Sequence, residues 1–145
     1  AATTMAAMRL APRIAPQPSA LDLAPGETKM WTIVGMDLAG LTADELLLHY
    51  DSKAMDVMDI SFGAALSIDL MKPPVATISA ATGTIRVKSS DGKPLVFAGG
   101  GEVLALRVHG GVTGETFLVM ENPNFRDARG KAVVAAVAGG KALVN

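Results

Sequence analysis

The sequence of 145 residues contains no cysteine. This absence excludes disulfide bonds, zinc sites with cysteine ligands, iron–sulfur clusters and thiol nucleophiles. The chain is nevertheless long enough to bury a hydrophobic core without such cross-links. A domain without cysteine suits the periplasm or the cell exterior, but the absence alone leaves the compartment open.

Aromatic residues and a net charge are also scarce. Aromatics make up 4% of the chain although hydrophobic residues make up 50%, so we expect a core of Ala, Val, Leu, Ile and Met. The 13 basic and 14 acidic residues give a formal charge of -1, and the basic residues are scattered. Nucleic acids and anionic membranes require a clustered positive charge. We therefore predict that the chain binds no nucleic acid.

Long apolar runs are missing as well. No run approaches the ~20 residues that a membrane helix needs, which predicts no direct membrane insertion. The sequence begins at Ala1 without an initiator Met, and without the basic and apolar regions of a signal peptide. Such a start indicates a fragment or a processed chain, in which a targeting signal could have stood upstream.

The patterns of catalytic and metal sites are absent too. His49 and His109 lie on predicted strands, with no Gly-x-Ser-x-Gly elbow and no pair of histidines at metal-binding spacing. The glycines at 99–101 lack the Lys-Ser/Thr of a phosphate-binding loop, and no calcium-loop pattern occurs. Asp56 and Asp59 fit a solvated strand face, although spacing alone leaves open a carboxylate pair for glycoside hydrolysis. We predict a protein that is not an enzyme, with no catalytic residue, metal or cofactor.

What the chain does contain is a series of short apolar runs separated by turn residues. Residues 1–20, rich in Ala and Pro, predict a semi-rigid linker with a first edge strand over 8–14; a proline-rich ligand is the alternative. Residues 21–145 form one domain of short runs at regular spacing, which favours an all-β sandwich or barrel of about nine strands. The runs are 29–36, 45–50, 55–60, 65–70, 75–80, 83–89, 102–109, 116–120, 131–138 and 141–144.

Alternation along these strands separates a predicted core from a predicted surface. Residues 43–48 also have helix propensity, but the short distance from Leu41 to the turn at Asp51 favours a strand. The side chains expected in the core are Leu46, Leu48, Tyr50, Leu104, Leu106, Val108 and Phe117. The side chains expected to point outward are Glu45, Leu47, His49, Arg86 and Lys88.

Seven short motifs follow one another between residues 21 and 144. They are APGET at 24–28, LLLHYDS at 46–52, MDVMDI at 55–60, GTIRV at 83–87, GEVLALRV at 101–108, FRDARGK at 125–131 and GKALV at 140–144. In their order and spacing they resemble the cohesin module. That family is a nine-stranded antiparallel sandwich with jelly-roll topology, which binds dockerins in cellulosomes and occurs on other bacterial envelope proteins.

The resemblance implies that the chain binds a protein through one sheet face. By position, the partner-binding residues are Glu45, Leu47, His49, Arg86 and Lys88, which alternation also turns outward. Cellulosomal relatives tend to carry small or apolar residues in place of the two cations, which favours a changed partner on a retained fold. The alternative is that these five residues form only a solvated face.

We therefore expect a protein–protein recognition module whose partner is dockerin-like or another envelope component. The resemblance also implies an extracytoplasmic location, in the periplasm, at the outer membrane or outside the cell, as part of a larger bacterial protein. The two cations predict an acidic partner surface and binding that weakens with salt.

Two alternatives remain at this point. The first is a carbohydrate-binding module, which shares the jelly-roll architecture. It needs exposed aromatic rings, whereas Trp31 and Tyr50 occupy positions that look inward. The second is a structural or assembly domain of a larger secretion-system or outer-membrane protein.

Overall fold

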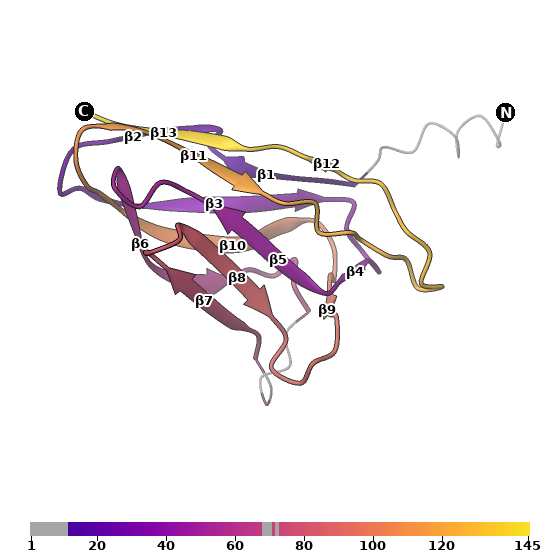
Figure 1. The fold of residues 1–145 in the computed structure, drawn as a ribbon. Helices are drawn as coiled ribbons and strands as arrows, with labels where there is room; N and C mark the ends of the chain where they lie inside the picture. Colours follow the sequence, from indigo (N-terminus) through magenta and orange to yellow (C-terminus); the bar gives the residue numbers. More distant parts are fainter. Residues whose placement is uncertain (1–11, 68–70, 72) are drawn as a thin grey trace, which may run out of the picture.

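The structure is a computed structural model that describes residues 12–67, 71 and 73–145. None of these residues lies in a helix, and the all-β class is confirmed (Figure 1). The strands are β1 (Arg13–Gln17), β2 (Ala20–Leu23), β3 (Thr28–Met36), β4 (Thr42–Ala43), β5 (Glu45–His49), β6 (Met55–Phe62), β7 (Val75–Ser79), β8 (Thr84–Lys88), β9 (Leu95–Val96), β10 (Gly101–Gly110), β11 (Gly114–Met120), β12 (Ala136–Val137) and β13 (Gly140–Val144).

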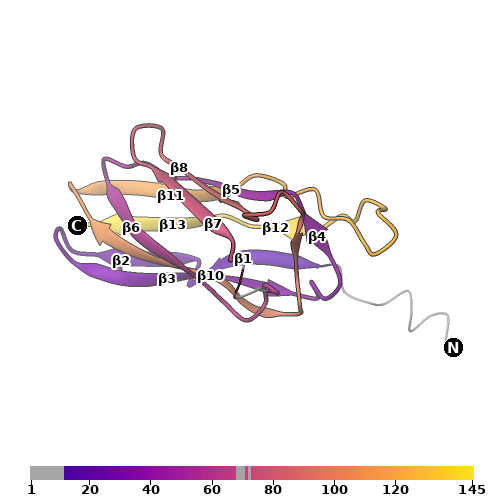
Figure 2. The same ribbon diagram turned by 90° about the horizontal axis from the view of Figure 1, so that it is seen from below.

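The strands form two packed layers, as a sandwich requires. One sheet has the order β12-β1-β3-β10-β6, and the other has the order β2-β13-β11-β5-β8-β7; β4 and β9 pair separately. Figure 2 shows β11 and β5 in one layer and β3 and β10 in the other. The predicted sandwich is confirmed, with thirteen described strands instead of nine, because β4, β9 and β12 are two-residue pieces and the N-terminal segment is divided into β1 and β2.

The N-terminal segment takes part in both sheets. It runs in one sheet as β1, passes Pro18 and Ser19, and continues in the other sheet as β2. In each sheet it pairs in parallel with a C-terminal strand, β12 or β13, whereas the other described pairs are antiparallel. The expected edge strand over residues 8–14 lies partly outside the described residues; the strand observed is Arg13–Gln17.

Two predicted strands are shorter than the sequence suggested. Of the run 65–70, Leu66 forms a single bridge to Phe97, and residues 68–70 lie outside the described residues. Of the run 131–138, only Ala136–Val137 is a strand. The preceding residues form a loop whose turn is held by Asp127, because its carboxylate accepts hydrogen bonds from two backbone N–H groups beyond it in the chain.

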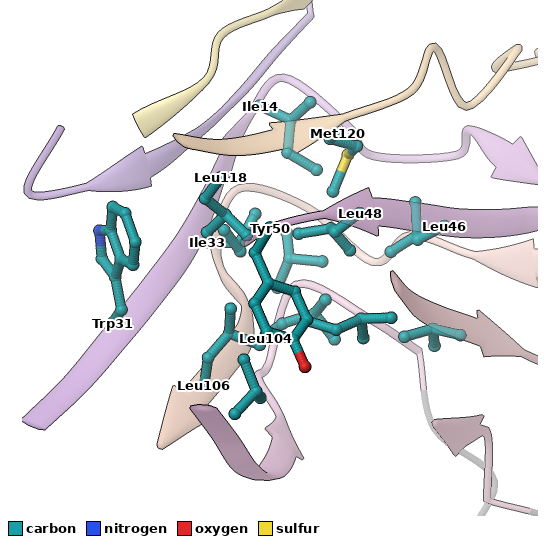
Figure 3. Close-up of a cluster of buried hydrophobic side chains, with 14 of the residues drawn as sticks. Ile14, Trp31, Ile33, Leu46, Leu48, Tyr50, Leu104, Leu106, Leu118 and Met120 are labelled. Atoms are coloured by element: carbon teal, nitrogen blue, oxygen red, sulfur yellow. The ribbon is translucent and has the colours of Figure 1, made fainter. Parts of the chain in front are cut away.

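The core lies between the two sheets and is mostly aliphatic (Figure 3). The residues predicted to be buried that are found there are Leu46, Leu48, Tyr50, Leu104, Leu106 and Val108. Trp31 is fully buried beside them, and its indole N–H donates a 2.6 Å hydrogen bond to the carbonyl of Pro18. The inward orientation of Trp31 and Tyr50 is therefore confirmed.

The prediction that Phe117 belongs to the core is wrong. Its neighbour Thr116 faces the core with 1% of its surface exposed, so Phe117 points to solvent with 55% exposed. The Thr116 hydroxyl accepts a 2.7 Å hydrogen bond from the backbone N–H of Asp51, which satisfies the buried oxygen. In β10, a register shift next to Val103 breaks the expected alternation and leaves Val103 and Leu104 both buried.

Candidate recognition face

The five residues that the sequence predicted for the site lie on one outer face. β5 and β8 pair antiparallel, with Glu45 opposite Lys88 and Leu47 opposite Arg86. His49 lies two residues further along β5 on the same side of the sheet. Side chains opposite each other on one face of a sheet come within contact distance, so the pairing brings the five residues together.

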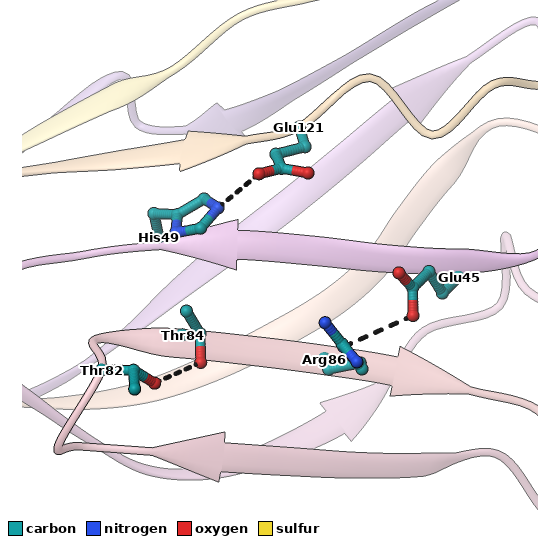
Figure 4. Close-up of polar contacts among 6 residues, drawn as sticks. All are labelled: Glu45, His49, Thr82, Thr84, Arg86 and Glu121. Atoms are coloured by element: carbon teal, nitrogen blue, oxygen red, sulfur yellow. Dashed lines mark hydrogen bonds and ion pairs between the residues drawn. The ribbon is translucent and has the colours of Figure 1, made fainter.

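Glu45 lies beside both cations of the face. Its Oε2 is 3.4 Å from Arg86 Nε and 3.6 Å from Lys88 Nζ (Figure 4 draws the contact with Arg86). This oxygen is buried and has no hydrogen-bond partner, so the contacts are ion pairs without hydrogen-bond geometry. The two cations, from which the sequence predicted an acidic partner, therefore share one carboxylate of the same chain.

His49 has an acidic neighbour that the sequence did not single out. Its Nε2 is 2.8 Å from Glu121 Oε1 (Figure 4). The backbone N–H of Glu121 donates to the carbonyl of Leu47, which holds the carboxylate beside β5 directly after the end of β11. Glu121 continues the outward positions of β11, and correct alternation for that strand would have identified it.

The larger part of the face missed by the sequence is apolar. Phe117 and Val119 project from β11 with 55% and 47% of their surfaces exposed. Val119 lies directly opposite His49, so the apolar pair adjoins the predicted residues. We define the recognition face as Glu45, Leu47, His49, Arg86, Lys88, Phe117, Val119 and Glu121.

Two shallow grooves hollow the recognition face. One of about 530 Å³ is lined by Glu45, Leu47, Arg86 and Lys88 together with residues of the loops at 89–93 and 122–124. The other, of about 500 Å³, lies at the opposite end of β5 and includes His49, Phe117 and Val119. The two grooves therefore lie at opposite ends of β5.

The charges of the recognition face balance one another. Arg86 and Lys88 are offset by Glu45 and Glu121 when His49 is neutral. A balanced surface attracts charged partners only weakly at a distance. The expected acidic partner therefore remains a prediction, and the apolar pair on β11 is the stronger feature of the face.

The structure also places His109 and Asp59, which the sequence raised for metal binding or catalysis. No group of three His, Asp or Glu side chains among the described residues could hold a metal ion. His109 lies on the other sheet, with Nδ1 2.9 Å from the hydroxyl of Thr28. Asp59 forms an ion pair with Arg107, in keeping with a solvated strand face. In the part of the chain that is described, no helix is long and apolar enough to cross a membrane.

Of the comparisons with known proteins, the one with solved structures found similar chains. No family model matches the chain, and no curated protein matches it in sequence. The OlpC cohesin of Clostridium thermocellum, solved in complex with a dockerin, is 19% identical with a TM-score of 0.74, over 94% of this chain and 95% of that chain. A non-cellulosomal cohesin from the archaeon Archaeoglobus fulgidus is 14% identical with a TM-score of 0.70, over 94% and 92%.

A third similar structure is the OlpA cohesin of Clostridium thermocellum, also solved in complex with a dockerin. It is 13% identical, with a TM-score of 0.74, over 94% of this chain and all 100% of that chain. Agreement over whole chains at such low identity concerns the fold. The chain therefore has the fold of the cohesin domains, as its motifs predicted.

Proposed function

We propose that the chain is a protein-recognition module that binds its partner through the recognition face. The observation that carries this proposal is the exposure of Phe117 and Val119 beside His49 on the outer face of the six-stranded sheet. Contiguous exposed apolar side chains favour an interface, because a partner removes them from water. The paired charges around them form the polar rim that such interfaces have.

The structural neighbours support a protein as the partner. The OlpC and OlpA cohesins are each described in complex with a dockerin, and the archaeal cohesin is described as non-cellulosomal. We propose a dockerin-like domain or another envelope component as the partner, outside the cytoplasm and within a larger bacterial protein. A module of this kind binds and does not catalyse.

The test is a pair of matched double variants. Phe117→Ser with Val119→Ser removes the apolar pair of the recognition face. Met30→Ser with Met58→Ser removes similarly exposed residues, 50% and 52%, from the outer face of the other sheet. The probes are a set of purified dockerin domains and solubilised envelope proteins, with binding measured by biolayer interferometry.

We expect the β11 variant to lose at least about tenfold in affinity for any partner found, since truncating a central apolar contact costs on the order of 1–2 kcal/mol or more. The Met30 and Met58 variant should bind as the unmodified chain does. Equal binding by both variants would place the interface elsewhere on the molecule.

One observation favours carbohydrate as a second candidate. The sequence argument against sugars relied on the absence of exposed aromatic rings, but Phe117 is exposed. It lines the second groove together with polar residues such as Asp51 and Thr82. A single ring offers only one stacking position, so we expect no retardation in affinity electrophoresis on cellulose, chitin or peptidoglycan. Retardation that Phe117→Ser abolishes would reverse the order of the two candidates.

The assembly alternative places another part of the parent protein on the same face. The same pair of double variants tests it, with the parent's other domains as the probe. Binding that depends on Phe117 and Val119 would then identify the partner as intramolecular.

A further inference from the structure

The six-stranded sheet ends at β7, and the outer edge of this strand is open among the described residues. β7 pairs with β8 along its whole length. The backbone hydrogen bonds described outside the sheets do not involve residues 73–80. Figure 1 shows β7 at the lower margin of the molecule. An open edge presents N–H and C=O groups in a row, which favours pairing with a further strand.

The other sheet edges carry features that discourage such pairing, and β7 does not. β12 has only two residues. β2 contains Asp22, whose carbonyl accepts a hydrogen bond from the Lys29 ammonium. β6 carries Asp56 and Asp59 and pairs across a register shift. Val75–Ser79 has no charge and no proline, so nothing in its sequence opposes an added strand.

The core is incompletely covered on this flank of the sandwich. Ala76 and Ile78 of β7 point inward but are only partly buried, and so are Ile60 and Phe62 of the neighbouring strand β6. At the opposite edge, Leu23 of β2 is almost completely buried. An added strand beside β7 would remove apolar surface from water, which is favourable.

We infer that β7 pairs antiparallel with β7 of a second copy of this chain, about a twofold axis at Thr77. This register places Thr77 opposite Thr77 of the second copy, and Val75 opposite Ser79. On the inner side it places Ala76 opposite Ile78, which covers the half-buried flank. No like charges meet, and the contact is the same patch on both copies, as twofold symmetry requires.

The limits of the strand set the strength and the geometry of this dimer. Pro73 and Pro74 precede it and the turn at 80–83 follows it, so the pairing covers about five residues and the dimer is weak. The twofold axis is perpendicular to the sheet, so both recognition faces lie on the same side of one continuous sheet. Such a dimer can hold a partner with two binding sites more tightly than either copy alone.

The chain has no cysteine, so single cysteines can test the register directly. Residues directly opposite in an antiparallel pair have Cα atoms about 4.5–5.5 Å apart, within the reach of a disulfide. In the proposed register the two copies of residue 77 meet. The two copies of residue 75 lie about 14 Å apart, four residues along the strand and on opposite strands, and so do the two copies of residue 79.

We expect Thr77→Cys to form a cross-linked dimer under mild oxidation. Val75→Cys and Ser79→Cys should each form no cross-link alone, but an equimolar mixture of the two should cross-link. Labelling of each thiol with maleimide shows that it is accessible. An accessible Thr77→Cys that does not cross-link, or a Val75→Cys that does so alone, overturns the proposal.

Sedimentation velocity gives a second readout without cysteines. The unmodified chain should self-associate as its concentration rises, and Thr77→Lys should sediment as a 14.9 kDa monomer, because two lysines would meet on the axis. Thr84→Lys is the matched control, since it adds the same charge to the same face on β8 and should leave self-association unchanged. A monomeric unmodified chain at high concentration also overturns the proposal.

Discussion

The hydroxyl of Thr116 accepts a 2.7 Å hydrogen bond from the backbone N–H of Asp51, on the side of β11 that also buries Leu118 and Met120. The two residues lie 65 positions apart in the sequence. Because Thr116 points inward, the next residue, Phe117, points to solvent. The hydrogen bond in the core and the exposed ring on the recognition face therefore follow from the same orientation of β11.

The first prediction concerns this hydrogen bond. Thr116→Val keeps the shape of the side chain but leaves the Asp51 N–H without its acceptor, so the free energy of unfolding should fall by about 1–3 kcal/mol. Thr113→Val, at an exposed position just before β11, should change it by less than about 0.5 kcal/mol. Urea unfolding monitored by circular dichroism measures both. Equal stability of the two variants would mean that the hydrogen bond does not stabilise the fold.

Leu106 provides a test of the core itself. It is fully buried in β10, so Leu106→Ala should lower the free energy of unfolding by about 2–5 kcal/mol. Val134→Ala, at a side chain that is almost fully exposed, is the control and should have little effect. The same urea titrations measure both, and a loss below about 1 kcal/mol for Leu106→Ala would place the residue outside the core.

The sequence predicted where the core strands lie better than it predicted which side of each strand faces the core. Alternation correctly predicted that Leu46 and Leu48 are buried, because β5 is a regular strand with Glu45 and His49 on its other side. It failed at β11, where a threonine is inside and a phenylalanine outside. The reason is that the partner of the Thr116 hydroxyl is a backbone group distant in sequence, which local pattern does not show.

The candidate site was likewise predicted only in part. The outward positions on β5 and β8 followed from alternation and from the resemblance. The contact of Arg86 and Lys88 with Glu45 depends on the strand register, which one strand's sequence does not determine. Glu121 lies after the end of a strand, where it is positioned by its backbone hydrogen bond to the neighbouring strand.

Gly140 provides a prediction about close packing. A Cβ at this position would lie 2.7 Å from Cζ2 of Trp31 and 3.0 Å from Pro16. Gly140→Ala should therefore cost about 1–3 kcal/mol through overpacking, and should change the fluorescence of Trp31, the single tryptophan. Gly99→Ala, where nothing lies within 4 Å, should change neither. An unchanged emission spectrum for Gly140→Ala would show that the indole is not tightly held against β13.

Tyr50 gives a prediction about pH. Burial, with a smaller contribution from the charge of Asp56, raises the pKa of its phenol above the ordinary value of 10.0. Above about pH 10 the unfolded chain therefore releases the proton while the folded chain keeps it, so this residue's contribution to stability is lost as pH rises through the folded pKa.

The comparison is between the unmodified chain and Tyr50→Phe, in urea unfolding at neutral and alkaline pH. The buried hydroxyl has no hydrogen-bond partner among the described residues, so we expect Tyr50→Phe to be at least as stable at neutral pH. At alkaline pH it should lose less stability than the unmodified chain. Identical pH profiles would contradict the raised pKa, and absorbance titration of the single tyrosine measures it directly.

The last prediction concerns the charges of the recognition face. Because Glu45 is paired with both Arg86 and Lys88, association of the unmodified chain with its partner should depend only weakly on salt. Glu45→Gln keeps the side chain's shape but leaves the two cations unpaired, which should speed association with an acidic partner at low ionic strength. At physiological salt the Debye length is about 8 Å, so the attraction between the cations and an acidic partner is largely screened. The gain in association rate should therefore disappear as salt is added. Asp59→Asn, which leaves Arg107 unpaired on the other sheet, is the control, because it raises the net charge by the same amount away from the recognition face. Stopped-flow association rates, measured with the partner that depends on Phe117 and Val119, give the result. Faster association of Glu45→Gln would show that the cations face an acidic surface, whereas slower association would show that Glu45 itself contacts a basic group of the partner.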